Sequence, residues 1–182
     1  EKNVTFDEAP LISVENGRIT TVSVTGPDGE QIDGAPVDGG SAWKIDTSDL
    51  DFGTKYVVTA NAVDLRGKET SASDSFRTFV PENELEVSTN LTDGETYGVG
   101  MPIIVTFNQP IKDRAAIEKH LLVNVDGAPI EGSWHWDSDT QVSYRPKEYW
   151  PADSKVELDA EIKGVNAGDQ VYAMQNATED FK

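Results

Sequence analysis

Apolar and polar residues alternate at every second position along much of this chain. The clearest stretch is KVELDAEIKGV, whose alternating apolar residues are Val156, Leu158, Ala160 and Ile162. The same alternation recurs in PIIVTF (102–107), QVSY (141–144) and YVVTANAV (56–63). A period of two is typical of strands that bury one face and expose the other. We therefore expect a chain built from short, half-buried strands.

Asp-Gly pairs separate these stretches and indicate tight turns. They occur at 28–29, 33–34, 38–39, 93–94 and 126–127. Short strands joined by frequent turns predict an all-β sandwich or barrel. One segment departs from this pattern: IKDRAAIEKHLL offers Asp113 as N-cap, good helix formers after it, and Ile117 with Leu121 on one face. We expect a short helix there.

The chain also repeats itself. DGEQIDG at 28–34 recurs as DGAPIEG at 126–132, TKYVVTA at 54–60 as SKVELDA at 154–160, and SDSFR at 73–77 as TEDFK at 178–182. The copies lie about 100 residues apart, which is the length of an immunoglobulin-like sandwich. The interpretation is two tandem immunoglobulin-like β-sandwiches, residues 1–82 and 83–182, with the helix in the second. The second copy ends inside its last strand, so we expect the natural protein to continue beyond Lys182.

Composition narrows the classes of function. The formal net charge is -18 at pH 7, and both halves are acidic. Such a surface repels nucleic-acid phosphates and anionic lipid, so neither nucleic acid nor a membrane surface is expected as a partner. No apolar run is long enough for direct membrane insertion. With no cysteine, the chain has no thiol nucleophile and no thiolate metal site.

Candidate catalytic and metal-binding residues have simpler explanations. His135 and His120 lack a second ligand at recognisable spacing and a nucleophile signature. The acidic row Glu157, Asp159 and Glu161 falls on the polar face of an alternating strand, where solvation is expected. The run PDGEQIDGAPVDGG is an alternative Ca²⁺ site, but Asp-Gly is also the usual hairpin turn. We therefore expect no catalytic residue, no metal and no cofactor.

Aromatic residues concentrate in GSWHWDSDTQVSYRPKEYWP, 132–151. Alternation places Trp134 and Trp136 on one side of a strand, so both are predicted to be core residues together with Tyr144. Tyr149 and Trp150 lie in a proline-flanked connection, where binding surfaces are often found. We expect this pair, with Tyr172, to be exposed as a docking surface between domains. The alternative is that these rings fold back over their own core.

Several longer segments resemble a known family. TYGVGMPIIVTFNQPIKDRAAIEKHLLV (96–123), EGSWHW (131–136), YRPKEYWPADSKV (144–156) and GVNAGDQVY (164–172) are similar to the second immunoglobulin-like domain of actinobacterial L,D-transpeptidases. ISVENGRITTVSVTGPDGEQIDG (12–34) and FGTKYVVTANAVD (52–64) resemble the domain that precedes it, more loosely. The resemblance therefore covers nearly the whole chain.

The resemblance implies a non-catalytic role. In that family a domain with a Ser-His-Gly-Cys motif follows and makes 3→3 peptidoglycan cross-links, and the enzyme is exported and often anchored as a lipoprotein. This chain has no such motif, so no catalytic residue is carried over. The expected partner is a downstream catalytic domain of the same polypeptide, outside the cytoplasm, with a membrane anchor upstream of Glu1. The alternative is a free-standing module that binds peptidoglycan or glycan.

Overall fold

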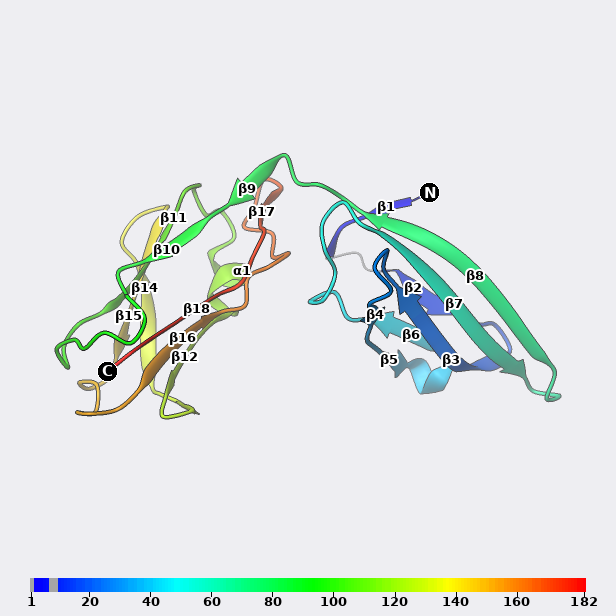
Figure 1. Cartoon of the computed structure of the whole chain (residues 1–182), viewed down its shortest axis with the longest axis horizontal. Coiled ribbons are helices and arrows are strands. Elements are labelled where there is room, and N and C mark those ends of the chain that lie inside the picture. The colour runs from blue at the N-terminus through cyan, green and yellow to red at the C-terminus, as the bar shows by residue number, and fades with distance from the viewer. Residues whose placement is uncertain (1, 7–9) are drawn as a thin grey trace. The chain divides into compact units, whose positions relative to one another are not determined.

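The computed structural model describes residues 2–6 and 10–182 and divides into two compact units, Glu1–Val80 and Pro81–Lys182 (Figure 1). The sequence placed the boundary two residues later, after Glu82. Almost all regular structure is β-strand, and the predicted all-β class is confirmed. We call the two parts unit 1 and unit 2.

Unit 1 has two sheets. The larger has the order β1 (Lys2–Val4), β8 (Glu69–Thr78), β7 (Lys55–Asp64), β3 (Gly17–Thr25) and β4 (Gln31–Ile32). The smaller has the order β2 (Leu11–Ser13), β6 (Ala42–Ile45) and β5 (Gly34–Val37), with a 3-10 turn, η2 (Asp38–Gly40), between β5 and β6. Residues of both sheets, among them Val24, Ile45 and Phe76, form one buried core.

Unit 2 has two four-stranded sheets. One has the order β10 (Val87–Thr89), β11 (Ile103–Phe107), β15 (Gln141–Pro146) and β14 (Gly132–Trp136). The other has the order β13 (Ala128–Pro129), β12 (Leu121–Val125), β16 (Val156–Ala160) and β18 (Ala177–Phe181). A parallel pair, β9 (Asn83–Leu85) and β17 (Val171–Ala173), completes the unit.

The topology of the two units agrees with the repeat found in the sequence. In unit 1 the series β4-β3-β7-β8 forms one sheet and β2-β6-β5 belongs to the other. In unit 2 the strands at the equivalent places along the chain form β13-β12-β16-β18 in one sheet and β11-β15-β14 in the other. The same connections therefore build both sandwiches, and the repeated segments fall on equivalent strands.

The period-two stretches form the expected strands. In β11 and in β16, buried and half-buried residues alternate along the strand. Ile103, Val105 and Phe107 contribute to the core of unit 2 from β11, and Val156, Leu158 and Ala160 from β16. Because alternate side chains point to opposite faces, this places one face of each sheet in the core.

The predicted helix is confirmed as α1 (Arg114–Glu118), in the connection from β11 to β12. The Asp113 carboxylate caps it and accepts a hydrogen bond from the Ala116 backbone N–H at 2.9 Å. Ile117 is fully buried against the core of unit 2. A short helix cannot be stable alone, so this buried side chain and the cap hold it.

The Asp-Gly pairs at 28–29, 93–94 and 126–127 lie in turns, whereas Gly34 of the pair at 33–34 begins β5 and the pair at 38–39 lies in η2. Asp126 and Gly127 have positive φ angles of 50° and 80°, the backbone of a tight hairpin turn between β12 and β13. The Asp126 carboxylate also accepts from the Lys155 backbone N–H at 2.9 Å. In unit 1 the run 27–40 forms β4, β5, η2 and the turns next to them. Across residues 2–6 and 10–182, no group of three or more His, Asp or Glu side chains is placed to hold a metal.

Candidate functional site

The aromatic stretch of residues 132–151 lies in unit 2, on β14, β15 and the connection that follows. Trp134 and Trp136 are half-buried and pack against the core from the same face of β14, while His135 is exposed between them. Tyr144 is buried and lies opposite Trp134 in the sheet, with the ring centroids 5.0 Å apart. Its hydroxyl donates to the Ile130 carbonyl oxygen at 2.8 Å. These three rings accordingly belong to the packing of unit 2.

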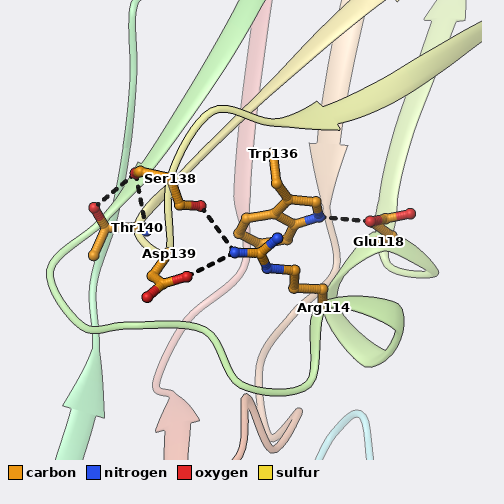
Figure 2. A network of polar contacts seen from close by, with 6 residues as sticks. All are labelled: Arg114, Glu118, Trp136, Ser138, Asp139 and Thr140. Atoms are coloured by element: carbon orange, nitrogen blue, oxygen red, sulfur yellow. Dashed lines mark hydrogen bonds and ion pairs between the residues drawn. The ribbon is translucent and has the colours of Figure 1, made fainter.

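The Trp136 indole is held by Phe107 on β11 and by Arg114 and Glu118 on α1, and Figure 2 shows the two contacts from α1. Phe107 stacks on the ring with centroids 5.9 Å apart, and the Arg114 guanidinium lies 4.9 Å from the ring centroid. The indole N–H donates to the Glu118 carboxylate at 2.6 Å. A cation over an indole face is a favourable cation–π contact. Trp136 therefore joins α1 to the sheet.

Arg114 extends this arrangement to the turn between β14 and β15. Its guanidinium pairs with the Asp139 carboxylate at 2.7 Å and donates to the Ser138 carbonyl oxygen at 3.4 Å (Figure 2). The sequence pattern identified Trp136 as a core residue but did not indicate its partners. The signal available was the spacing of Arg114 and Glu118, four residues apart, which puts both on the same side of a helix. We call Arg114, Glu118, Trp136 and Asp139 the Trp136 clamp.

The prediction that Trp150 is exposed was wrong. Only 4% of the residue is accessible, and it belongs to the core of unit 2. The indole stacks on Tyr144 with centroids 6.1 Å apart, and its N–H donates to the Met101 carbonyl oxygen at 2.6 Å. The Trp150 backbone N–H donates to the Val99 carbonyl oxygen at 2.9 Å. The connection folds back because the large apolar ring gains more from burial than from exposure.

Tyr172 is likewise buried, with 3% of the residue accessible, so it cannot form an exposed docking surface. It lies on β17, which pairs in parallel with β9 through the Tyr172 and Glu84 positions. Its hydroxyl accepts a hydrogen bond from the Asn166 side-chain amide at 3.2 Å. In Figure 1, β17 and the C-terminus lie at opposite ends of unit 2. Because its ring is buried, Tyr172 does not share an exposed surface with Tyr149.

Tyr149 remains as the exposed member of the predicted set. It is 75% accessible, and its ring passes close to Gly100, where an added Cβ would lie 3.4 Å from the ring. Next to it is an open cavity of about 500 Å³, which we call the Tyr149 cavity. Val99, Gly100, Met101, Arg145, Pro146, Lys147, Glu148 and Tyr149 line it. Val99 is itself 44% accessible, so two apolar side chains face solvent here.

The Tyr149 cavity lies near the end of the chain. The Lys182 carbonyl oxygen accepts from the Tyr97 backbone N–H at 2.8 Å, and the Lys182 N–H donates to the Glu95 carbonyl oxygen at 2.9 Å. Tyr97 is two residues before Val99, which lines the cavity. Phe181 is 2% accessible and contacts Trp150 directly beneath this region. The last strand of the chain is thus fixed beside the cavity.

Two buried phenols and one carboxyl group have raised pKa values. Burial raises the pKa values of the Tyr56 and Tyr144 phenols, and both hydroxyls are already engaged in structural hydrogen bonds. Partial burial and the neighbouring carboxylates Asp93 and Asp180 raise the pKa of Glu179. Glu179 lies on β18 and does not line the Tyr149 cavity. No described helix is long and apolar enough to cross a membrane.

Comparison with known proteins agrees with this architecture. The chain is 34% identical over 179 residues to L,D-transpeptidase 5 of Mycobacterium tuberculosis (strain ATCC 25618 / H37Rv), covering 96% of this chain and 39% of that protein. It is 27% identical over 178 residues to L,D-transpeptidase 2 of Mycobacterium tuberculosis (strain CDC 1551 / Oshkosh), covering 98% of this chain and 43% of that protein. The chain thus spans about two fifths of these curated relatives.

Solved structures of similar proteins include L,D-transpeptidase 3 from Mycobacterium tuberculosis, which is 32% identical with a TM-score of 0.38 over 52% of this chain and 35% of that one. The family model described as Bacterial Ig domain matches residues 1–166. The predicted resemblance to the immunoglobulin-like region of L,D-transpeptidases is confirmed. Since the family match covers nearly all of the sequence, the chain belongs to the bacterial Ig domain family.

Proposed function

We propose that this chain is the non-catalytic immunoglobulin-like region of an exported L,D-transpeptidase. In this role it holds a cysteine-bearing catalytic domain of the same polypeptide in position for 3→3 cross-linking of peptidoglycan. Similarity to L,D-transpeptidase 5 over 96% of this chain but only 39% of that protein supports the assignment. The chain itself contains no cysteine that could act as the nucleophile.

The anchoring of the C-terminal strand is the observation that carries this proposal. β18 pairs with β16 from Ala177 to Phe181, and the Phe181 ring is buried. The backbone of Lys182 is bonded in both directions to the segment Glu95–Tyr97. A domain that follows Lys182 would therefore leave unit 2 from a fixed point and in a fixed direction. A spacer needs such an attachment, because a flexible segment after Lys182 would not fix the orientation of the catalytic domain.

The Tyr149 cavity is the surface of unit 2 on which that domain is proposed to dock. Of the three residues expected to form a docking surface, Trp150 and Tyr172 are buried. Tyr149 is the one that stays exposed, with Val99 beside it. The surface lies within a few residues of the point where the chain leaves the unit. An exposed tyrosine supported by backbone offers contact area with little ordering entropy to lose. Trp150 supports this surface from within.

The relatives are L,D-transpeptidases, which supports a place outside the cytoplasm. We propose that the complete protein is held at the cell envelope by an anchor upstream of Glu1. A net charge of -18 suits a spacer that should not adhere to anionic lipid.

A second candidate function is binding of peptidoglycan or glycan by this chain alone. The observation in its favour is again the Tyr149 cavity, where an exposed aromatic ring lies beside Arg145 and Lys147. An aromatic face and a few polar groups around a concave site are common features of ligand sites. Lys147 is paired with Glu131 at 3.0 Å, so part of that polarity is already used within the unit.

Two measurements on the purified chain separate these candidates. The spacer proposal predicts no saturable binding to purified peptidoglycan in sedimentation assays, and no covalent adduct with a carbapenem by mass spectrometry. Saturable binding that Tyr149→Ala abolishes would favour the second candidate, with Leu65→Ala as a matched exposed control. A covalent adduct would contradict both.

A further inference from the structure

The strand β18 of unit 2 carries a carboxyl group on its inner face. Alternate residues of a strand point to the same side, so Ala177, Glu179 and Phe181 share one face of β18. Phe181 is buried in the core of unit 2, and Ala177 packs against that core. Glu179 lies opposite Leu158 of β16, which is 1% accessible. Glu179 is therefore a half-buried acid in the core-facing row of β18.

The charged groups that act on Glu179 are themselves acids. One is Asp180, the next residue on β18, and the other is Asp93, in the connection from β10 to β11. The Asp93 side chain is within hydrogen-bonding reach of the Glu179 carboxyl group. Two carboxyl groups can form a hydrogen bond only when one of them holds a proton. The contact between Glu179 and Asp93 therefore requires a proton.

The lysine of this region is engaged on the opposite face of the sheet. Lys155 pairs with Glu157 at 2.7 Å and with Asp180 at 3.6 Å. Glu157 and Asp180 are opposite each other in the register of β16 and β18, one position away from the pair Leu158 and Glu179. Alternation places Glu157 and Asp180 on the outer face. From the inner face, β16 presents only the apolar Leu158 to Glu179.

Asp93 also holds the end of β18. Its carboxylate accepts a hydrogen bond from the Asp180 backbone N–H at 2.8 Å. Three backbone bonds join the same two segments: Gly94 N–H to the Asp180 carbonyl oxygen at 2.9 Å, Lys182 N–H to Glu95 at 2.9 Å, and Tyr97 N–H to Lys182 at 2.8 Å. We call these four bonds, between Asp93–Tyr97 and Asp180–Lys182, the β18 attachment.

We propose that protonation of Glu179 tightens the β18 attachment, which makes this end of unit 2 a pH-sensitive device. In the protonated form, the Glu179 O–H donates a hydrogen bond to the Asp93 carboxylate, which also accepts from the Asp180 N–H. In the ionised form, the two carboxylates repel each other at the residue that holds β18. The proton comes from water and returns to it.

The direction of the response follows from the surroundings of Glu179. Burial, and then the neighbouring carboxylates, raise its pKa above the ordinary value of 4.5. A group whose pKa is raised by folding stabilises the folded state in its protonated form. The contribution is complete below about pH 4.5, the unfolded value, and is lost as the pH rises through the raised value. The β18 attachment is therefore tighter in mildly acidic solution than at neutral pH.

The consequence for function rests on the proposed spacer role. The catalytic domain is proposed to follow β18, so the β18 attachment would fix its orientation more firmly as the surroundings of the cell envelope become acidic. The response of the attachment itself is a property of unit 2 and can be measured on this chain alone.

Hydrogen exchange of the whole chain, followed by NMR, tests the proposal. The amides of Gly94, Tyr97, Asp180 and Lys182 donate the bonds of the attachment. Their protection factors, which correct for the intrinsic effect of pH on exchange, should rise as the pH is lowered from about 7.5 to about 4. The rise should approach about tenfold for each pH unit by which the titration midpoint of the Glu179 carboxyl carbon lies above 4.5.

Three variants identify the group responsible. Glu179→Gln keeps the shape of the side chain and offers an N–H to Asp93, so protection should be high over the whole pH range. Asp93→Asn removes one neighbouring charge and should move the Glu179 midpoint down toward 4.5. Glu161→Gln is the matched control, because it removes the same charge from an exposed residue of the same unit. It should respond to pH as the wild-type chain does.

Three results would overturn the proposal. The first is a Glu179 midpoint at or below 4.5. The second is protection of the four amides that is the same at both ends of the pH range. The third is a Glu179→Gln chain that keeps the wild-type response, because another group would then be its source. None of these results bears on the spacer role, which does not require the attachment to respond to pH.

Discussion

The indole of Trp150 meets the ring of Phe181 edge to face, with centroids 5.8 Å apart and an interplanar angle of 86°. This contact joins the connection after β15 to the last strand of the chain. Tyr97 also packs against Phe181, with ring centroids 5.5 Å apart. The residue expected at the surface therefore packs against the C-terminal strand.

Trp150→Ala should destabilise unit 2 by about 3–5 kcal/mol, because a large buried ring and its hydrogen bond to Met101 are lost. Urea unfolding followed by fluorescence would measure this change. Tyr149→Ala, one residue earlier and 75% accessible, should change stability by less than about 0.5 kcal/mol. Equal effects of the two substitutions would contradict the placement of these rings.

The Trp136 clamp should show coupling between its members. Arg114→Ala removes the cation over the indole and the pair with Asp139, both partly exposed, and should cost about 1 kcal/mol. A double-mutant cycle with Trp136→Leu, which removes the aromatic face, isolates the contact between the two side chains and should give about 0.5–1 kcal/mol. Lys147→Ala, which removes a surface ion pair with Glu131, is the control. Strict additivity of the Arg114 and Trp136 changes would mean that the contact between these two side chains makes no energetic contribution.

Stability should fall at alkaline pH. Burial raises the pKa values of Tyr56 and Tyr144 above the ordinary value of 10.0, so folding favours the neutral phenols. Their contribution is complete below about pH 10, the unfolded value, and is lost as pH rises through the raised folded values. Urea midpoints measured from pH 8 to 11 should decrease above about pH 10. A flat profile would contradict the burial of these phenols.

Tyr56→Phe removes both the phenol that titrates and its hydrogen bond, and the two losses are measured at different pH. The Tyr56 oxygen accepts from the Asp51 backbone N–H at 2.8 Å, so its removal leaves that donor without this partner. The variant should lose about 1–2 kcal/mol at neutral pH and show a shallower alkaline decline in unit 1. A decline identical to that of the wild-type chain would assign the titration to other groups.

The two units should unfold as separate cores. Phe76 stacks on Tyr56 in the core of unit 1, and no residue of that cluster belongs to the core of unit 2. Phe76→Ala should lower the free energy of unfolding of unit 1 by about 3–5 kcal/mol and shift one calorimetric transition to lower temperature. Trp150→Ala should shift the other transition in the same way. A single transition shifted by both substitutions would mean that the cores are coupled.

Local patterns in the sequence were sufficient to predict these strands, the helix and the repeat. Alternation identified β11, β16 and β7, and the capping residue Asp113 marked the start of α1. These features depend on neighbours along the chain, so they leave a trace in the sequence. The similar topology of the two units agrees with the offset of the repeated segments.

The placement of the aromatic residues that were expected to be exposed depended on distant contacts instead. Trp150 is buried because Met101, Val99 and Phe181 meet it, and each is at least 30 residues away. Tyr172 is buried because β17 pairs with β9, a short parallel pairing across most of unit 2. Neither set of contacts leaves a local signature in the sequence. The prolines that flank Tyr149 and Trp150 suggested an exposed connection instead.

The most direct test of the spacer role is a flexible insertion in the complete protein. A Gly-Ser linker of roughly 10 residues, placed immediately after Lys182, would free whatever follows from the anchored strand. The account predicts that 3→3 cross-links in isolated cell walls fall, while turnover of a small soluble substrate by the same enzyme is unchanged. The same linker placed in the turn at Arg66-Gly67 of unit 1 is the control. Unchanged wall cross-linking with the linker after Lys182 would contradict the claim that this chain positions a catalytic domain.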